Sequence, residues 1–95
     1  MRAARSVEFA LRARTARLLA QWVKDRCDDP ERINLGEVAR LVARMNDDAL
    51  ADHLRSLLDH PVGDLSWQQA RADAAFRARA ALVKERGNPA PHRLA

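Results

Sequence analysis

Apolar residues recur at intervals of three or four along much of the chain, the spacing that puts side chains on one face of an α-helix. The first such stripe consists of Val7, Leu11, Thr15, Leu18 and Trp22. This stripe predicts a helix over residues 4–26. The helix has to end before Pro30, because a proline disfavours helical geometry in the residue that precedes it.

Two shorter apolar stripes follow with almost no gap between them. Each is preceded by an asparagine, Asn34 or Asn46, whose side chain can accept a hydrogen bond from the first turn of a helix. The pattern therefore predicts one helix over residues 34–45 and another over 47–59. A single helix over 35–59, bent near Asn46, is the alternative.

The last third of the chain has clear signals for both ends of a helix. The sequence SWQQ, which begins at Ser66, matches a capping box, and Gly87 follows a basic turn. These signals predict a helix over residues 66–86, followed by a flexible tail over 88–95. We therefore expect an all-α protein, a small bundle of about four helices in a single domain over residues 1–87.

Composition narrows the class of protein. A chain of 95 residues is long enough for one domain. Its single cysteine, Cys27, cannot form an internal disulfide, which favours a reducing compartment and a cytoplasmic protein. No apolar run is long enough for a membrane span, so no membrane partner is expected. Residues 1–24 resemble a mitochondrial targeting helix in composition, but the regular apolar stripe favours a folded element.

The sequence gives no sign of catalytic chemistry, so we expect a non-catalytic protein without a cofactor. Its three glycines are scattered and cannot form a glycine-rich phosphate loop. His53 and His60 share a helix face but lie about 10.5 Å apart along it, because each residue rises 1.5 Å. One zinc ion cannot bind both histidines at its usual distance of about 2 Å. No metal site is therefore expected.

The two short helices have the spacing of a helix-turn-helix motif but the wrong charge for reading DNA. A DNA-reading motif places the first residues of its second helix against the bases. Here those residues include Asp47, Asp48 and Asp52, which would repel a polyanion. Residues 34–58 are therefore predicted to be packed helices of the bundle.

Charge is distributed in three blocks along the chain. The net charge is +5 over residues 1–26, −5 over 27–65 and +4 over 66–95. The first and last helices are expected to pair charges with the acidic middle across their seams. If those two helices lie side by side, they form one basic surface. Its candidate residues are Arg5, Arg12, Arg17, Lys24, Arg77 and Lys84. Such a surface predicts binding to nucleic-acid backbone without sequence specificity, within a larger nucleoprotein assembly. A solvated polar face is the alternative.

The first and last helices also have apolar residues away from their main stripes. These residues are Phe9, Leu19, Val23, Phe76 and Val83. A helix in a small monomer usually buries one stripe, so a second stripe indicates either a central helix or a partner. The alternative function is therefore a protein-interaction adaptor or small regulator, which is a homo-oligomer or docks on another protein. Isolated exposed apolar residues are the simpler explanation.

Overall fold

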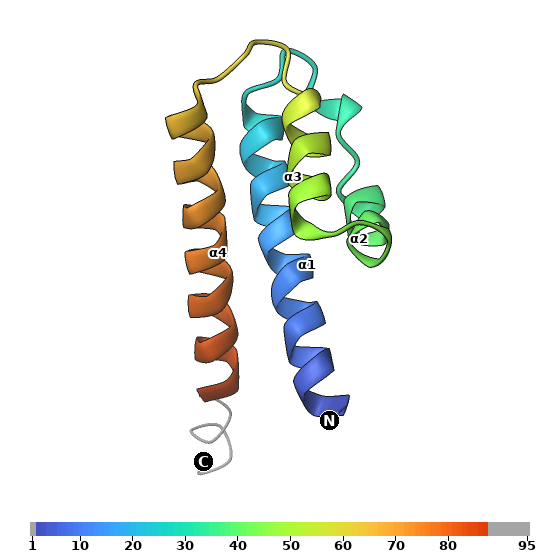
Figure 1. The fold of residues 1–95 in the computed structure, drawn as a ribbon, viewed down its shortest axis with the longest axis vertical. Helices are drawn as coiled ribbons and strands as arrows, with labels where there is room; N and C mark the ends of the chain where they lie inside the picture. The colour runs from blue at the N-terminus through green and yellow to red at the C-terminus, as the bar shows by residue number, and fades with distance from the viewer. Residues whose placement is uncertain (1, 88–95) are drawn as a thin grey trace.

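The computed structural model describes residues 2–87, with side chains described over residues 7–85. It contains four α-helices and one short 3-10 helix (Figure 1). In chain order these are α1 (Arg2–Asp25), η1 (Pro30–Arg32), α2 (Leu35–Arg44), α3 (Asp47–Ser56) and α4 (Asp64–Gly87). The described residues form no strand, so the prediction of a small all-α bundle is confirmed. None of the described helices combines the length and the apolar character needed to cross a bilayer. The predicted tail, residues 88–95, lies outside the described residues.

A break in the backbone separates α2 from α3. Met45 and Asn46 both adopt extended backbone angles, with ψ of 147° and 171°. The Asn46 side chain accepts a hydrogen bond from the Ala49 amide at 2.8 Å, and Asn34 caps α2 in the same way. Both predicted caps are confirmed, and the single bent helix is wrong.

The start of α4 differs from the prediction. The helix begins at Asp64, before Ser66, and the Trp67 amide donates to the Gly63 carbonyl at 3.0 Å. Asp64 suits this position because a carboxylate is stabilised near the N-terminus of a helix. Its Oδ1 also accepts a hydrogen bond from Arg55 at 2.9 Å. The SWQQ capping box is therefore wrong as the start of the helix, and Ser66 lies inside α4.

Helix α1 is the centre of the molecule. It packs against α2, α3 and α4, whereas α4 packs chiefly on α1. Helix α4 runs antiparallel to α1 along one side, so α1 begins and α4 ends at the same end of the bundle (Figure 1). Near the opposite end, the rings of Trp22 and Trp67 meet edge to face with their centroids 5.9 Å apart. The expected side-by-side placement of the first and last helices is therefore present.

The central position of α1 changes which of its residues are buried. Its buried side chains are Ala16, Leu19, Ala20 and Val23, and the predicted main stripe is only partly buried. A central helix has neighbours on more than one side, so the face toward α2 and α3 is buried more deeply than the predicted stripe. On α4 the buried side chains are Trp67, Ala70, Ala74 and Ala78. These small alanines allow α4 to approach α1 closely.

Candidate functional site

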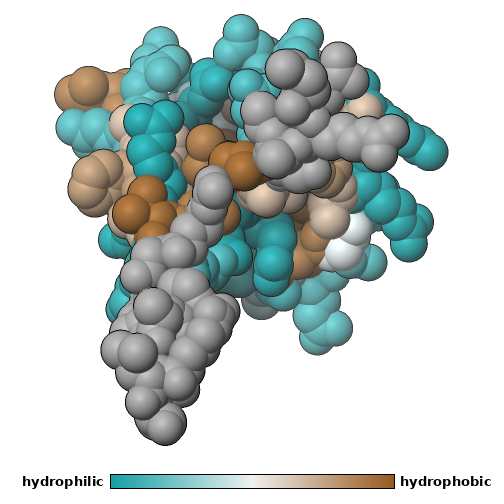
Figure 2. Space-filling model, turned by 90° about the horizontal axis from the view of Figure 1, so that it is seen from below, coloured by the Kyte–Doolittle hydropathy of each residue, from teal (hydrophilic) through white to brown (hydrophobic). Residues whose placement is uncertain are grey.

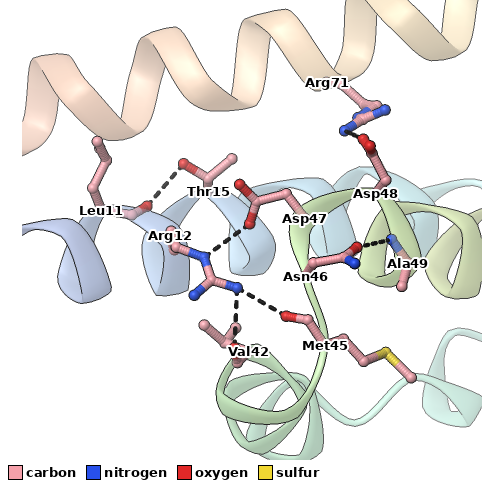
Figure 3. A network of polar contacts seen from close by, with 10 residues as sticks. All are labelled: Leu11, Arg12, Thr15, Val42, Met45, Asn46, Asp47, Asp48, Ala49 and Arg71. Atoms are coloured by element: carbon pink, nitrogen blue, oxygen red, sulfur yellow. Dashed lines mark hydrogen bonds and ion pairs between the residues drawn. The ribbon is translucent and has the colours of Figure 1, made fainter.

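Arg12, a predicted phosphate-binding residue, is engaged inside the molecule (Figure 3). Its Nε donates to Asp47 Oδ1 at 2.8 Å. Its Nη2 donates to the carbonyls of Met45 and Val42, at 2.8 and 3.2 Å. These three contacts hold the junction between α2 and α3 against α1. The guanidinium is therefore occupied by acceptors of its own chain.

Other ion pairs also cross the seams between helices, and the pair between Arg71 and Asp48 is of the kind that the charge blocks predict, since it joins α4 to the acidic middle. Arg71 of α4 binds Asp48 of α3 at 3.1 Å (Figure 3). Arg14 of α1 contacts Glu85 of α4 through two hydrogen bonds. The two aspartates at the start of α3 are thus both neutralised by arginines. Because these pairs are largely exposed, each contributes only about 0–1 kcal/mol to stability.

The remaining predicted basic residues form a smaller group than expected. Arg77 pairs with Asp73, one turn earlier in α4, at 3.0 Å. Arg17, Lys24 and Lys84 have no ion-pair partner among the described side chains. The side chain of Arg5 lies outside the described residues.

The position of two of these cations follows from a neighbouring ion pair. Arg17 is one helical turn after Arg14, and Lys84 directly precedes Glu85. Since Arg14 binds Glu85, Arg17 and Lys84 flank the same seam between α1 and α4.

The residues predicted to bind a partner divide into two groups. Leu19 and Val23 are 5% and 0% exposed, so assigning them to a partner surface was wrong. They face the chain's own core because α1 is the central helix. Phe9, Phe76 and Val83 are exposed. The second stripe of α1 is therefore buried at Leu19 and Val23 but exposed at Phe9, whereas α4 retains an uncovered apolar face.

Leu65, which the sequence reasoning missed, belongs to this apolar face of α4. Leu65, Phe76 and Val83 are 73%, 72% and 64% exposed. At 100° per residue the three fall within about 20° of one another and about 180° from buried Ala74. Apolar surface is visible on the α4 side of the molecule when it is seen from below (Figure 2). We call Leu65, Ala72, Phe76 and Val83 the outer α4 face.

A half-open groove of about 480 Å³ lies between α1, α3 and α4. It exists because α4 rests on α1 and leaves space beside α3. Its apolar lining includes Leu11, Leu19, Leu50 and Ala75, and its polar lining includes Arg12, Arg71, Arg79, Asp47 and Gln68. Arg12 and Arg71 already bind carboxylates, so the groove has few uncommitted polar groups.

A cluster of polar groups lies at the end of the bundle where α1 ends and α4 begins. It joins the connection after α1 to the connection after α3. Asp59 accepts a hydrogen bond from the Asp28 amide at 2.7 Å and another from Arg32, and these contacts lower the pKa of Asp59. Burial, followed by the Asp59 charge, raises the pKa of the Cys27 thiol. The Cys27 Sγ donates to the Leu57 carbonyl at 3.4 Å. The thiol is therefore kept protonated at neutral pH, which does not favour a nucleophile.

Comparison with models of protein families, with curated proteins and with solved structures finds no match to this chain.

Proposed function

We propose that the protein is a non-catalytic helical interaction module that docks on another protein surface through the outer α4 face. The observation that carries this proposal is the exposure of Leu65, Phe76 and Val83 in one stripe of one helix. Burying an exposed large apolar side chain stabilises a complex by about 1.5–3 kcal/mol. Because the three side chains lie on one face of one helix, a single partner surface can contact all of them, which is not so for apolar residues scattered over the molecule.

The ion pairs favour protein docking over a polyanion partner. Arg12 and Arg77, both expected to bind phosphate, are each paired with a carboxylate. A phosphate would have to compete with these internal partners. A protein partner at the outer α4 face has no such competition, because the exposed apolar side chains gain contacts and lose none.

Retrieval of partners from cells that express the tagged chain tests this function. The double variant Phe76→Ser, Val83→Ser should lose the retrieved partners, because it removes most of the apolar contact. The control is Ala39→Ser, Ala43→Ser, which changes two exposed residues of α2. Equal retrieval by the wild type and both variants, with unchanged thermal unfolding, would exclude docking through this face.

Binding to nucleic-acid backbone is the second candidate, and one observation favours it. Arg17, Lys24 and Lys84 have no carboxylate partner among the described side chains, and the first and last of them flank one seam. Three phosphate contacts predict that affinity for random duplex falls by about 40-fold when the salt concentration rises fourfold.

Charge reversal separates this candidate from general attraction to a basic protein. Replacing Arg17, Lys24 and Lys84 together by Glu should abolish duplex binding. Arg40→Glu on α2 serves as the matched control, since Arg40 is also exposed. Absence of binding by the wild type at low salt would remove this candidate.

A further inference from the structure

We propose that the outer α4 face binds the same face of a second copy of the chain, with the two α4 helices antiparallel. This inference rests on the proposed function and names its partner. The face points away from buried Ala74, so it lies on the side of α4 away from α1, with Ala72 at its border with the groove. A second helix can therefore lie along it without displacing α1, α2 or α3.

The spacing of the apolar residues is the first argument for a second copy. Leu65, Ala72, Phe76 and Val83 follow one another at intervals of seven, four and seven residues. The intervals are the same when the helix is read from either end. An antiparallel copy therefore places Leu65 opposite Val83 of the second copy and Ala72 opposite Phe76 of the second copy. A two-fold axis then passes between the helices at the height of residue 74.

The sizes of the side chains are the second argument. In the antiparallel register the large Phe76 ring of each copy faces the small Ala72 of the other copy. This contact therefore occurs twice, once on each side of the two-fold axis. This alternation of large and small residues allows two helices to approach to about 8–10 Å. In a parallel pair in register, Phe76 would face its own copy and Ala72 would face its own copy. The first contact would be crowded and the second would leave a gap.

A polar contact beside the seam is the third argument. The seam is flanked on one side by Gln68 and Arg79, both exposed. The antiparallel register puts Arg79 beside Gln68 of the second copy, whose amide oxygen can accept its hydrogen bond. It also keeps the two copies of Arg79 about 15 Å apart along the direction of the helices, at 1.5 Å of rise per residue. In a parallel pair in register, Arg79 would instead lie about 16.5 Å along the helix from Gln68 of the second copy and would have no such partner.

The interface would be small, because each copy contributes chiefly one helix. The apolar stripe from Leu65 to Val83 is about 27 Å long. Contacts of this size are at the low end of specific interfaces. We therefore expect a dimer that dissociates on dilution rather than a permanent one.

Sedimentation equilibrium over roughly a hundredfold range of protein concentration tests association. The wild type should shift from monomer to dimer mass. Phe76→Glu and, as a second variant, Val83→Glu should stay monomeric, since each puts a charge into the apolar seam. Ala39→Glu on α2 should behave as the wild type. Circular dichroism and thermal unfolding check that each variant is folded.

Cross-linking tests the antiparallel register, in a Cys27→Ser background and with a short thiol linker. Leu65→Cys and Val83→Cys should cross-link when the two variants are mixed. Leu65→Cys alone should not, because its two copies would be about 27 Å apart. Self-linking of Leu65→Cys would overturn the register. If the wild type remains monomeric at every protein concentration, the proposal that a second copy is the partner is wrong. The proposed function fails separately, if Phe76→Ser, Val83→Ser still retrieves every partner.

Discussion

At the scale of single residues, the arginines of this protein act chiefly as internal ties. Arg12 links α1 to the junction that follows α2, through one carboxylate and two carbonyl oxygens. The exposed ion pair with Asp47 contributes little by itself. The two carbonyl acceptors matter more, because part-buried carbonyls that lose their donor are left without a hydrogen bond.

Arg12→Met should therefore destabilise the fold by about 1–3 kcal/mol, since it removes the donor and keeps most of the apolar stem. The midpoint temperature of thermal unfolding should fall by about 4–8 °C for each kcal/mol of unfolding free energy lost. Arg17→Met, which changes an exposed arginine of the same helix, should shift stability by less than about 0.5 kcal/mol. Equal effects of the two substitutions would show that the junction contacts do not stabilise the fold.

Asp59 predicts a dependence of stability on pH. Its folded pKa is lowered from 3.8, chiefly by the hydrogen bond from the Asp28 amide. A lowered folded pKa gives stability that is present above pH 3.8 and is lost as pH falls through the folded pKa. The difference in unfolding free energy between the wild type and Asp59→Asn should therefore shrink on acidification below pH 3.8. Urea unfolding across that range measures it, and a constant difference would contradict the assignment.

At the scale of elements, α4 has two faces that differ in whether they can accommodate a larger side chain. Its alanine face is buried against α1, with Ala74 4% and Ala78 0% exposed. There is no room on this face for a larger side chain. The opposite face has room, because nothing in the described chain covers it.

Ala74→Leu should destabilise the protein by about 1–3 kcal/mol, because the added atoms push α4 away from α1. Ala80→Leu, on an exposed position of the same helix, introduces the same side chain and should change stability by less than about 0.5 kcal/mol. Chemical unfolding of the two variants measures both. A tolerated leucine at Ala74 would mean that the two helices pack loosely.

The elements could be predicted from local signals, and their burial could not. The asparagine caps at Asn34 and Asn46 act within one helical turn, so sequence alone located both breaks. The buried face of α1 depends on helices distant in the chain, so Leu19 and Val23 were assigned to a surface. The predicted basic surface is smaller than expected for the same reason, because the sequence does not show that Arg12 contacts Asp47 and two carbonyl oxygens. Leu65 was missed because the start of α4 was placed at Ser66.

At the scale of the whole molecule, stability is distributed unevenly around α1. Helix α1 contacts every other helix, whereas α4 rests chiefly on α1 alone. Elements with fewer tertiary contacts open at lower free energy than those at the centre.

Native-state hydrogen exchange should therefore show weaker protection in the middle of α4, near Ala74, than in the middle of α1, near Ala16. High protein concentration should raise protection in α4 if a second copy covers it. Protection that is uniform across the two helices would indicate that the bundle opens only as a unit.

The antiparallel pairing of α1 and α4 also has a topological consequence. Because α1 begins at the same end of the bundle at which α4 ends, a peptide that joins Gly87 to Arg2 would close the described residues into a ring (Figure 1). New ends could then be made at Gly63, where an added Cβ meets nothing within 4 Å. Such a permuted chain keeps every helix pairing, but the pairing of α4 with α1 becomes the first to be synthesised rather than the last.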